Sequence, residues 1–113
     1  MSQITTHILD TSRGKPAAGV NVVLEKPGSN DAWVLIGNGK TNSDGRVPEL
    51  LHIDVILAPG TYRLTFDTGG YFNSHGINAF YPSVSITFQT ADTSHYHVPL
   101  LLNPFGYSTY RGS

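Results

Sequence analysis

Apolar and polar residues alternate along several short stretches of the chain, which is the pattern expected of strands that bury one face. Residues 83–88 (SVSITF) show this alternation clearly, with β-branched and aromatic residues at every second position. Clusters of Gly, Pro, Asn, Asp and Ser separate the stretches at intervals of about ten residues. The pattern predicts strands at residues 4–9, 20–26, 33–39, 50–56 (weakly), 61–66, 83–89, 97–102 and 107–110.

Short strands at this regular spacing predict an all-β fold in which two sheets pack face to face as a sandwich. A helix is expected only at residues 70–75, where the Gly, Asn and Ser content makes it short or distorted. A chain of 113 residues is close to the usual size of one domain. We therefore expect residues 1–113 to form a single domain around one core.

The charge of the chain excludes some kinds of partner. Seven basic residues against eight acidic residues give a net charge of −1, which offers no positive surface for nucleic acid or for an anionic membrane. We therefore expect a small molecule as the substrate or ligand, and neither nucleic acid nor a membrane as a partner. Only 13% of the residues are charged, about half of the usual one quarter, so we expect other subunits to cover part of the surface.

The sequence contains no cysteine, so disulfides and thiolate chemistry are excluded and the five histidines are the main titratable groups. The first residues, MSQITTHILD, lack the basic and apolar regions of a secretory leader. No apolar run is long enough to span a membrane. From these absences we expect a cytoplasmic protein.

Two histidines lie in the segment HYHVPLLL, residues 95–102. Alternation along a strand places His95 and His97 on the face opposite the apolar core positions. Pro99 and Leu101 share this face with the histidines. A face that is partly apolar and partly polar is expected to be covered by a partner.

The first predicted strand repeats this arrangement, because His7 lies on the face opposite Ile4 and Ile8. The first and the penultimate strands of an all-β domain are often neighbours in one sheet. If they pair here, His7 and His97 meet on one surface.

Three motifs follow one another along the chain: THILD with the turn after it, the hairpin GKTNSDGR, and HYHVPLLL followed by the terminal YRGS. Together they resemble the transthyretin-related family, and within it the 5-hydroxyisourate hydrolases, over about residues 4–113. The resemblance implies a sandwich of two four-stranded sheets with one short helix. It also implies a homotetramer, built as a dimer of dimers, with ligand sites in the channel where the dimers meet.

The resemblance further implies a set of site residues. The catalytic positions of the hydrolases fall here on His7, Arg46 and His97. The hormone-carrying transthyretins resemble the chain in fold, but they have Lys, Glu and Thr at these three places and lack the Tyr-Arg-Gly-Ser end. The substrate-binding residues implied by the last strand and this end are Ser108, Tyr110, Arg111, Gly112 and Ser113.

The reaction implied is the hydrolysis of 5-hydroxyisourate in urate degradation, in which water attacks a ring carbonyl and gives the ureidoimidazoline carboxylate (OHCU). Such a reaction needs a base, a group that stabilises negative charge, and a proton for the leaving nitrogen. Histidine can be base and acid near neutral pH, so we expect His7 and His97 to activate the water and return its proton. Arg46 suits the developing oxyanion because its charge is permanent. No cofactor and no metal is expected.

Other interpretations remain open on the residues alone. His95 and His97 could join His7 in a zinc site with an open position, although no acidic residue stands at a ligand-like spacing. An arginine that follows an Asp-Gly turn is often only a solvated turn residue. The same fold could carry a small ligand without turning it over, as transthyretins do, or it could serve protein contacts alone.

Overall fold

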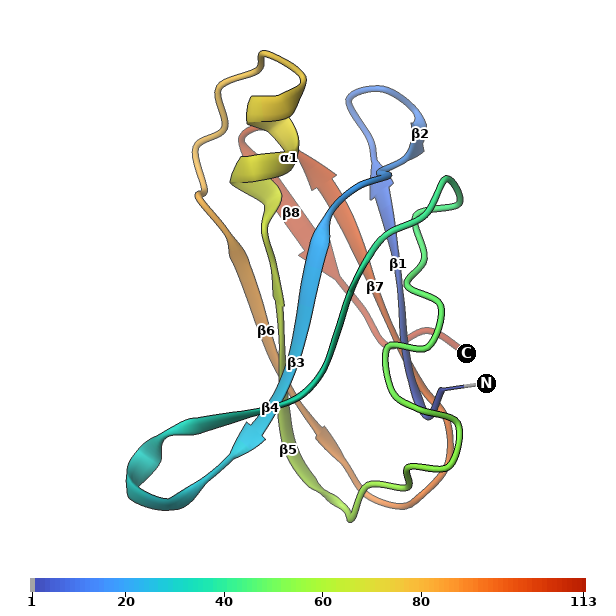
Figure 1. The fold of residues 1–113 in the computed structure, drawn as a ribbon. Coiled ribbons are helices and arrows are strands. Elements are labelled where there is room, and N and C mark those ends of the chain that lie inside the picture. Colours follow the sequence, from blue (N-terminus) through green and yellow to red (C-terminus); the bar gives the residue numbers. More distant parts are fainter. Residues whose placement is uncertain (1) are drawn as a thin grey trace.

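The structure, a computed structural model, describes residues 2–113 as two sheets packed against each other, with one helix at an end (Figure 1). The strands are β1 (Ile4–Asp10), β2 (Lys15–Pro16), β3 (Asn21–Pro27), β4 (Trp33–Lys40), β5 (Gly60–Phe66), β6 (Val84–Thr90), β7 (Tyr96–Asn103) and β8 (Gly106–Thr109). The helix α1 is Thr68–Ser74, and a 3₁₀ turn, η1, is Ser29–Asp31.

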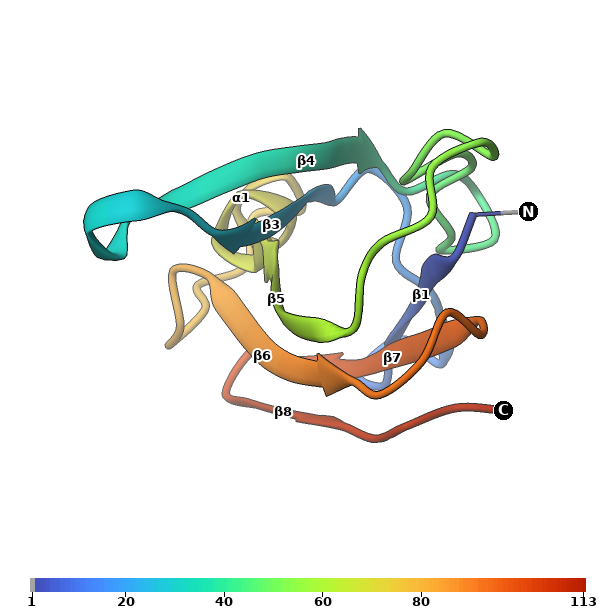
Figure 2. The ribbon, with the colours of Figure 1, turned by 90° about the horizontal axis from the view of Figure 1, so that it is seen from below.

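Each sheet has four strands. One sheet has the order β2-β1-β7-β8 and the other has the order β4-β3-β5-β6. Strands β1 and β7 run parallel, whereas the other pairs in the described chain are antiparallel. Seen from below, β3 and β4 lie on one side of the sandwich and β7 and β8 lie on the other (Figure 2). The predicted all-β sandwich of two four-stranded sheets with one short helix is confirmed.

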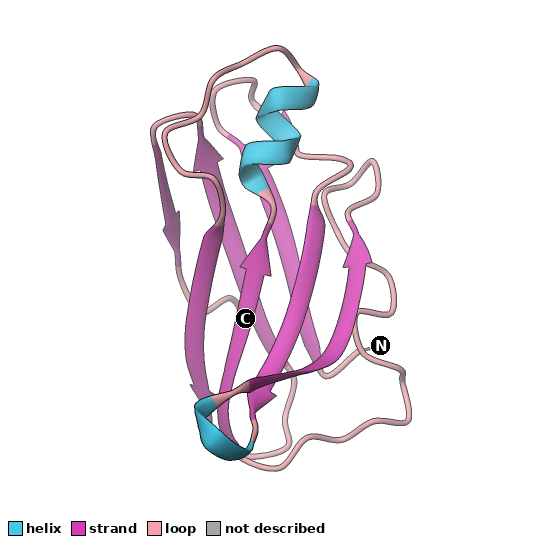
Figure 3. Ribbon diagram, turned by 60° about the vertical axis from the view of Figure 1, so that its left-hand side comes forward, coloured by secondary structure: helices cyan, strands magenta, loops and turns pink. Residues whose placement is uncertain are grey.

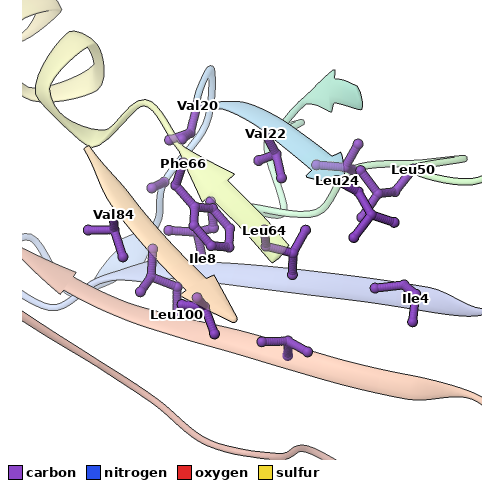
Figure 4. Packing of buried hydrophobic residues seen from close by; sticks show 14 of the residues in the cluster. Ile4, Ile8, Val20, Val22, Leu24, Leu50, Leu64, Phe66, Val84 and Leu100 are labelled. Atoms are coloured by element: carbon purple, nitrogen blue, oxygen red, sulfur yellow. The ribbon is translucent and has the colours of Figure 1, made fainter. Parts of the chain in front are cut away.

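The core lies between the sheets and fixes which way the first strand faces. Ile4 and Ile8 of β1 are completely buried, and Figure 4 shows them facing Val22 and Leu24 of β3 and Leu64 of β5. Burying side chains of this size contributes about 1.5–3 kcal/mol each. Because a slip of one residue would reverse every side chain of the strand, this burial also determines which residues of β1 face outward.

Helix α1 lies at one end of the sandwich, and η1 lies at the opposite end (Figure 3). The Asp67 side chain caps the first turn of α1 by accepting a 3.0 Å hydrogen bond from the backbone N–H of Gly70. The Tyr71 hydroxyl donates to the buried Asp10 carboxylate, at 2.7 Å, and so ties the helix to the end of β1. The helix that was predicted at residues 70–75 thus begins earlier, at Thr68, and ends at Ser74.

The weak strand predicted at residues 50–56 is wrong, because this segment forms loop and turns. Leu50 and Leu51 are both buried, and two successive buried residues do not fit the alternation of a strand with one buried face. Residues 47–50, which lead into the segment, pass over β4 at two glycines, because a Cβ on Gly37 would collide with the Leu50 carbonyl and one on Gly39 with the Val47 side chain. The short β2, which the sequence pattern did not predict, is the fourth strand of the β2-β1-β7-β8 sheet.

Candidate functional site

The parallel pairing of β1 and β7 brings their histidines to one face of the sheet. Thr5 is opposite His97 in this register, and His7 is opposite Pro99. The side chains of His7 and His97 are half-buried and point away from the core positions on either side of them. The first and penultimate strands are therefore neighbours, and the predicted meeting of His7 and His97 on one surface follows from their register.

Arg46 reaches this face through a turn that docks against β1. The Asn42 side chain accepts hydrogen bonds from the backbone N–H groups of Asp44 (2.9 Å) and Arg46 (3.1 Å), which closes the turn. Gly45 adopts a φ of 74° there, and its carbonyl accepts a 2.9 Å bond from Ile8 N–H. The backbone of Arg46 consequently forms a bridge with that of His7.

The last residues of the chain return to His97. The Gly112 N–H donates to the His97 carbonyl at 2.9 Å. A Cβ on Gly112 would stand 2.6 Å from Cδ2 of the His97 ring, so only glycine allows this close approach. The preceding Arg111 guanidinium lies 4.6 Å from the centre of the Tyr96 ring, a cation–π contact that holds the end of the chain against β7.

These segments surround a pocket of about 630 Å³. Arg46, His97 and Ser113 contribute to its wall, together with Thr5 and His95. His7 does not line the pocket and is joined to it through the backbone bridge with Arg46. The wall is completed by Ser2, Thr6, Asn42, Val47, Pro48 and Glu49. A space of this size accommodates a small bicyclic molecule.

The other predicted substrate-binding residues lie outside this pocket. Tyr110 and Arg111 line another pocket, of about 280 Å³, which His97 also lines. Ser108 is opposite Leu101 in the ladder of β7 and β8 and is exposed. Of the final four residues, Ser113 therefore reaches the pocket of Arg46 and His97, and Gly112 reaches the His97 ring through its backbone.

The environment of His97 favours the neutral imidazole. Partial burial lowers the pKa of His97 below the usual 6.5, and the charges of Arg46, His95 and His7 lower it further. A backbone hydrogen bond with Thr5 raises the pKa but does not outweigh these causes. A neutral imidazole next to a permanent positive charge can take a proton from water while the charge stabilises an oxyanion.

Sequence reasoning did not assign a function to Thr5. Its hydroxyl lies within hydrogen-bond distance of both His95 and His97. Only the strand register could have revealed this role, because Thr5 and His97 are 92 positions apart in the sequence. Within residues 2–113, no group of three or more His, Cys, Asp or Glu residues is arranged to hold a metal ion, so the zinc interpretation of His95 and His97 gains no support. In the same range, no helix is long and apolar enough to cross a membrane.

Comparison of the chain with known proteins identifies its family. Over residues 4–112 the chain matches the model of the HIUase/transthyretin family. A relative from Rhizobium meliloti, 5-hydroxyisourate hydrolase 2, is 50% identical over 98% of this chain and 96% of its own.

Two solved structures share the fold. Klebsiella pneumoniae 5-hydroxyisourate hydrolase superimposes with a TM-score of 0.84 at 39% identity, over 97% of this chain and 98% of the other. Sea bream transthyretin in complex with thyroxine gives 0.90 at 28% identity, over 98% and 95%. The protein therefore belongs to the HIUase/transthyretin family.

Proposed function

We propose that the protein hydrolyses 5-hydroxyisourate to the ureidoimidazoline carboxylate OHCU, as a step of urate degradation. The observation that carries this proposal is that Arg46 and His97 line one pocket, while the strand register and a backbone bridge place His7 on the same face beside Arg46. The relatives named for this reaction are about half identical to the chain over nearly its whole length. The activity for which these relatives are named agrees with the chemistry of the pocket.

In the proposed reaction, His97 is the general base. Its lowered pKa keeps the ring neutral near pH 7, so it can accept a proton from the attacking water. The water oxygen bonds to a ring carbonyl carbon, and the negative charge that develops on the carbonyl oxygen lies against the Arg46 guanidinium. The ring C–N bond then breaks, and His7, beside Arg46, supplies the proton that the leaving nitrogen requires.

The end of the chain shapes the pocket around His97 and binds substrate in this proposal. Ser113 lines the pocket and offers its hydroxyl and its terminal carboxylate as hydrogen-bond partners. Gly112 contacts the His97 ring, and Arg111 anchors the segment on Tyr96. Ser108 and Tyr110 belong to the same stretch, and their contact with substrate requires a wall supplied by another subunit.

We further propose that the active form is a homotetramer, built as a dimer of dimers. Strands β6 and β8 are each an edge strand of their sheet in the described chain. Each therefore presents backbone N–H and C=O groups that another strand could pair with. Near β8, Phe80 and Phe105 are 70% and 74% exposed. In the loop after β4, Ile53 and Ile56 are 63% and 72% exposed. Apolar groups exposed to this extent in two separate places support more than one subunit contact.

One experiment separates hydrolysis from the alternative of a transthyretin-type carrier. 5-Hydroxyisourate is generated freshly from urate, and its absorbance is followed with and without the protein. Hydrolysis predicts a decay above the spontaneous rate that is proportional to protein concentration. A decay at the spontaneous rate, with ligand bound to the protein, would refute the proposed activity and favour the carrier. Sedimentation velocity on the same preparation tests the tetramer independently.

A further inference from the structure

The hydroxyl of Thr5 is shared between two imidazole rings. Its Oγ1 lies 2.7 Å from Nδ1 of His97 and 2.8 Å from Nε2 of His95. The two rings stack with their centres 6.3 Å apart and their planes inclined by 24°. This arrangement follows from the register, because Thr5 is directly opposite His97 and the two histidines are two residues apart on one face.

The number of available hydrogens restricts how these contacts are made. A hydroxyl has one hydrogen to donate, and a neutral imidazole has one N–H and one acceptor nitrogen. Thr5 can therefore donate to His95 or to His97, but not to both. The ring nitrogen that does not receive the Thr5 hydrogen must carry its own hydrogen and donate it to Thr5 Oγ1.

The nitrogen of His97 that Thr5 engages decides between the two possibilities. Thr5 Oγ1 lies against Nδ1 at 2.7 Å, which leaves Nε2 as the nitrogen that can meet a water in the pocket lined by His97. On the proposed function His97 takes a proton from that water, so its lone pair must be on Nε2 and its hydrogen on Nδ1. The exposed His95 ring then offers the acceptor nitrogen.

We infer that Thr5 is a positioning residue that fixes His97 in the tautomer with its hydrogen on Nδ1. His97 donates Nδ1–H to Thr5 Oγ1, and Thr5 donates its hydroxyl hydrogen to Nε2 of His95. His95 thus orients the Thr5 hydroxyl. The lone pair of His97 is left on Nε2, which has no protein partner among residues 2–113.

The catalytic consequence rests on the proposed function. When water attacks, its O–H bond breaks and the proton binds to Nε2 of His97, which makes the ring an imidazolium. Its Nδ1–H remains bonded to an oxygen that accepts, so the positive charge is stabilised without a carboxylate. The opposite tautomer would present an N–H to the water and could not act as its base.

The tautomer can be read directly in the protein without substrate. The ¹⁵N chemical shifts of the His97 ring, assigned with a His97→Gln variant, distinguish Nδ1–H from Nε2–H. We expect the Nδ1–H form in the unchanged protein and in Thr5→Ser, which keeps the hydroxyl. In Thr5→Val we expect a mixture of the two forms. A dominant Nε2–H form in the unchanged protein would overturn the inference.

Kinetics on the same variants test the consequence. We expect kcat for 5-hydroxyisourate to fall about 10- to 100-fold in Thr5→Val, the usual cost of losing a group that orients a functional histidine, with little change in KM. Thr5→Ser should restore kcat, and His95→Phe should lower it less than Thr5→Val does. Thr65→Val, which removes a hydroxyl from the other sheet, is the matched control and should keep full activity.

The outcomes separate the two proposals. If the unchanged protein does not hydrolyse 5-hydroxyisourate but His97 shows the Nδ1–H form only when Thr5 has a hydroxyl, the proposed function fails and the tautomer assignment stands. If the unchanged protein is active and Thr5→Val keeps the same kcat, the positioning role fails and the proposed function stands.

Discussion

The outward faces of the two sheets use the same residue types in opposite ways. On the β4-β3-β5-β6 sheet, Arg63 donates twice to Glu25, at 3.1 and 2.8 Å, and its guanidinium lies 4.2 Å from the centre of the Trp33 ring. On the β2-β1-β7-β8 side, Arg46 has no carboxylate partner within residues 2–113, and its neighbours are histidines. An arginine whose charge is already neutralised serves structure, whereas one left without a carboxylate partner beside imidazoles can act on a substrate.

The largest expected effect comes from removing the imidazoles of the second face. His7→Asn and His97→Asn should each lower kcat/KM by about 10²- to 10⁴-fold, the usual contribution of general acid–base catalysis. His52→Asn is the matched control, since His52 is an exposed loop residue beside Asp54, and it should keep full activity. Circular dichroism and sedimentation should show the same fold and assembly in all three. Full activity in both His7→Asn and His97→Asn would rule out their proposed roles.

The two arginines can be compared in the same way. Arg46→Gln should lower kcat by about 10²- to 10³-fold, as expected for the loss of an oxyanion donor, and leave the thermal midpoint nearly unchanged. Arg63→Gln should keep full activity and lower the midpoint by a few degrees, because it breaks a partly exposed ion pair with Glu25. If Arg63→Gln impaired turnover and Arg46→Gln did not, the contrast between the two sheets would be refuted.

A smaller effect is expected from the contact between the chain end and His97. In Gly112→Ala the new methyl group would press on the ring, and a displacement of this kind should cost about 10- to 100-fold in kcat. In Gly106→Ala the nearest atom to the added carbon is 3.7 Å away, so activity should persist. Equal activity of the two variants would show that the position of His97 does not depend on this contact.

The smallest effect concerns pH. His97 acts as a base only when neutral, and its pKa lies below 6.5, so activity should be lost as the pH falls through this lowered pKa. In Arg46→Gln the pKa of His97, followed by NMR titration, should rise, since a nearby positive charge is removed. Burial, the larger cause, remains in the variant, so the pKa should still lie below 6.5. A titration of His97 above 6.5 in the unchanged protein would contradict this account.

Alternation along single strands predicted much of the fold. In a strand that buries one face, the order of apolar and polar residues within the strand itself shows which face is buried. Ile4 and Ile8 are in the core and His7 is outside it, as their spacing indicates. The segment around Leu50 was assigned wrongly because its burial comes from crossing the glycines of β4. The contact of Leu50 with Gly37 joins residues more than ten positions apart, and hydrophobic periodicity does not register such a contact.

The residues of the candidate site also differ in whether the sequence alone could predict their roles. The identities of His7, Arg46 and His97 could be proposed from motifs that resemble a known family. The role of Thr5 could not, because a threonine in a strand carries no signal of its own until the parallel register places it opposite His97. The difference between Ser113, which reaches the pocket, and Arg111, which lies on Tyr96, likewise depends on how the last residues fold back.

The parallel pairing of β1 and β7 also constrains how the protein is made. Hydrogen bonds such as that from the Thr6 hydroxyl to the Val98 carbonyl join residues 92 positions apart. Contacts of such high sequence separation form slowly. During translation, β1 cannot pair with β7 until nearly the whole chain has left the ribosome. The face shared by His7 and His97 therefore forms only after β7 has been synthesised, and until then the backbone groups of β1 that pair with β7 are unpaired.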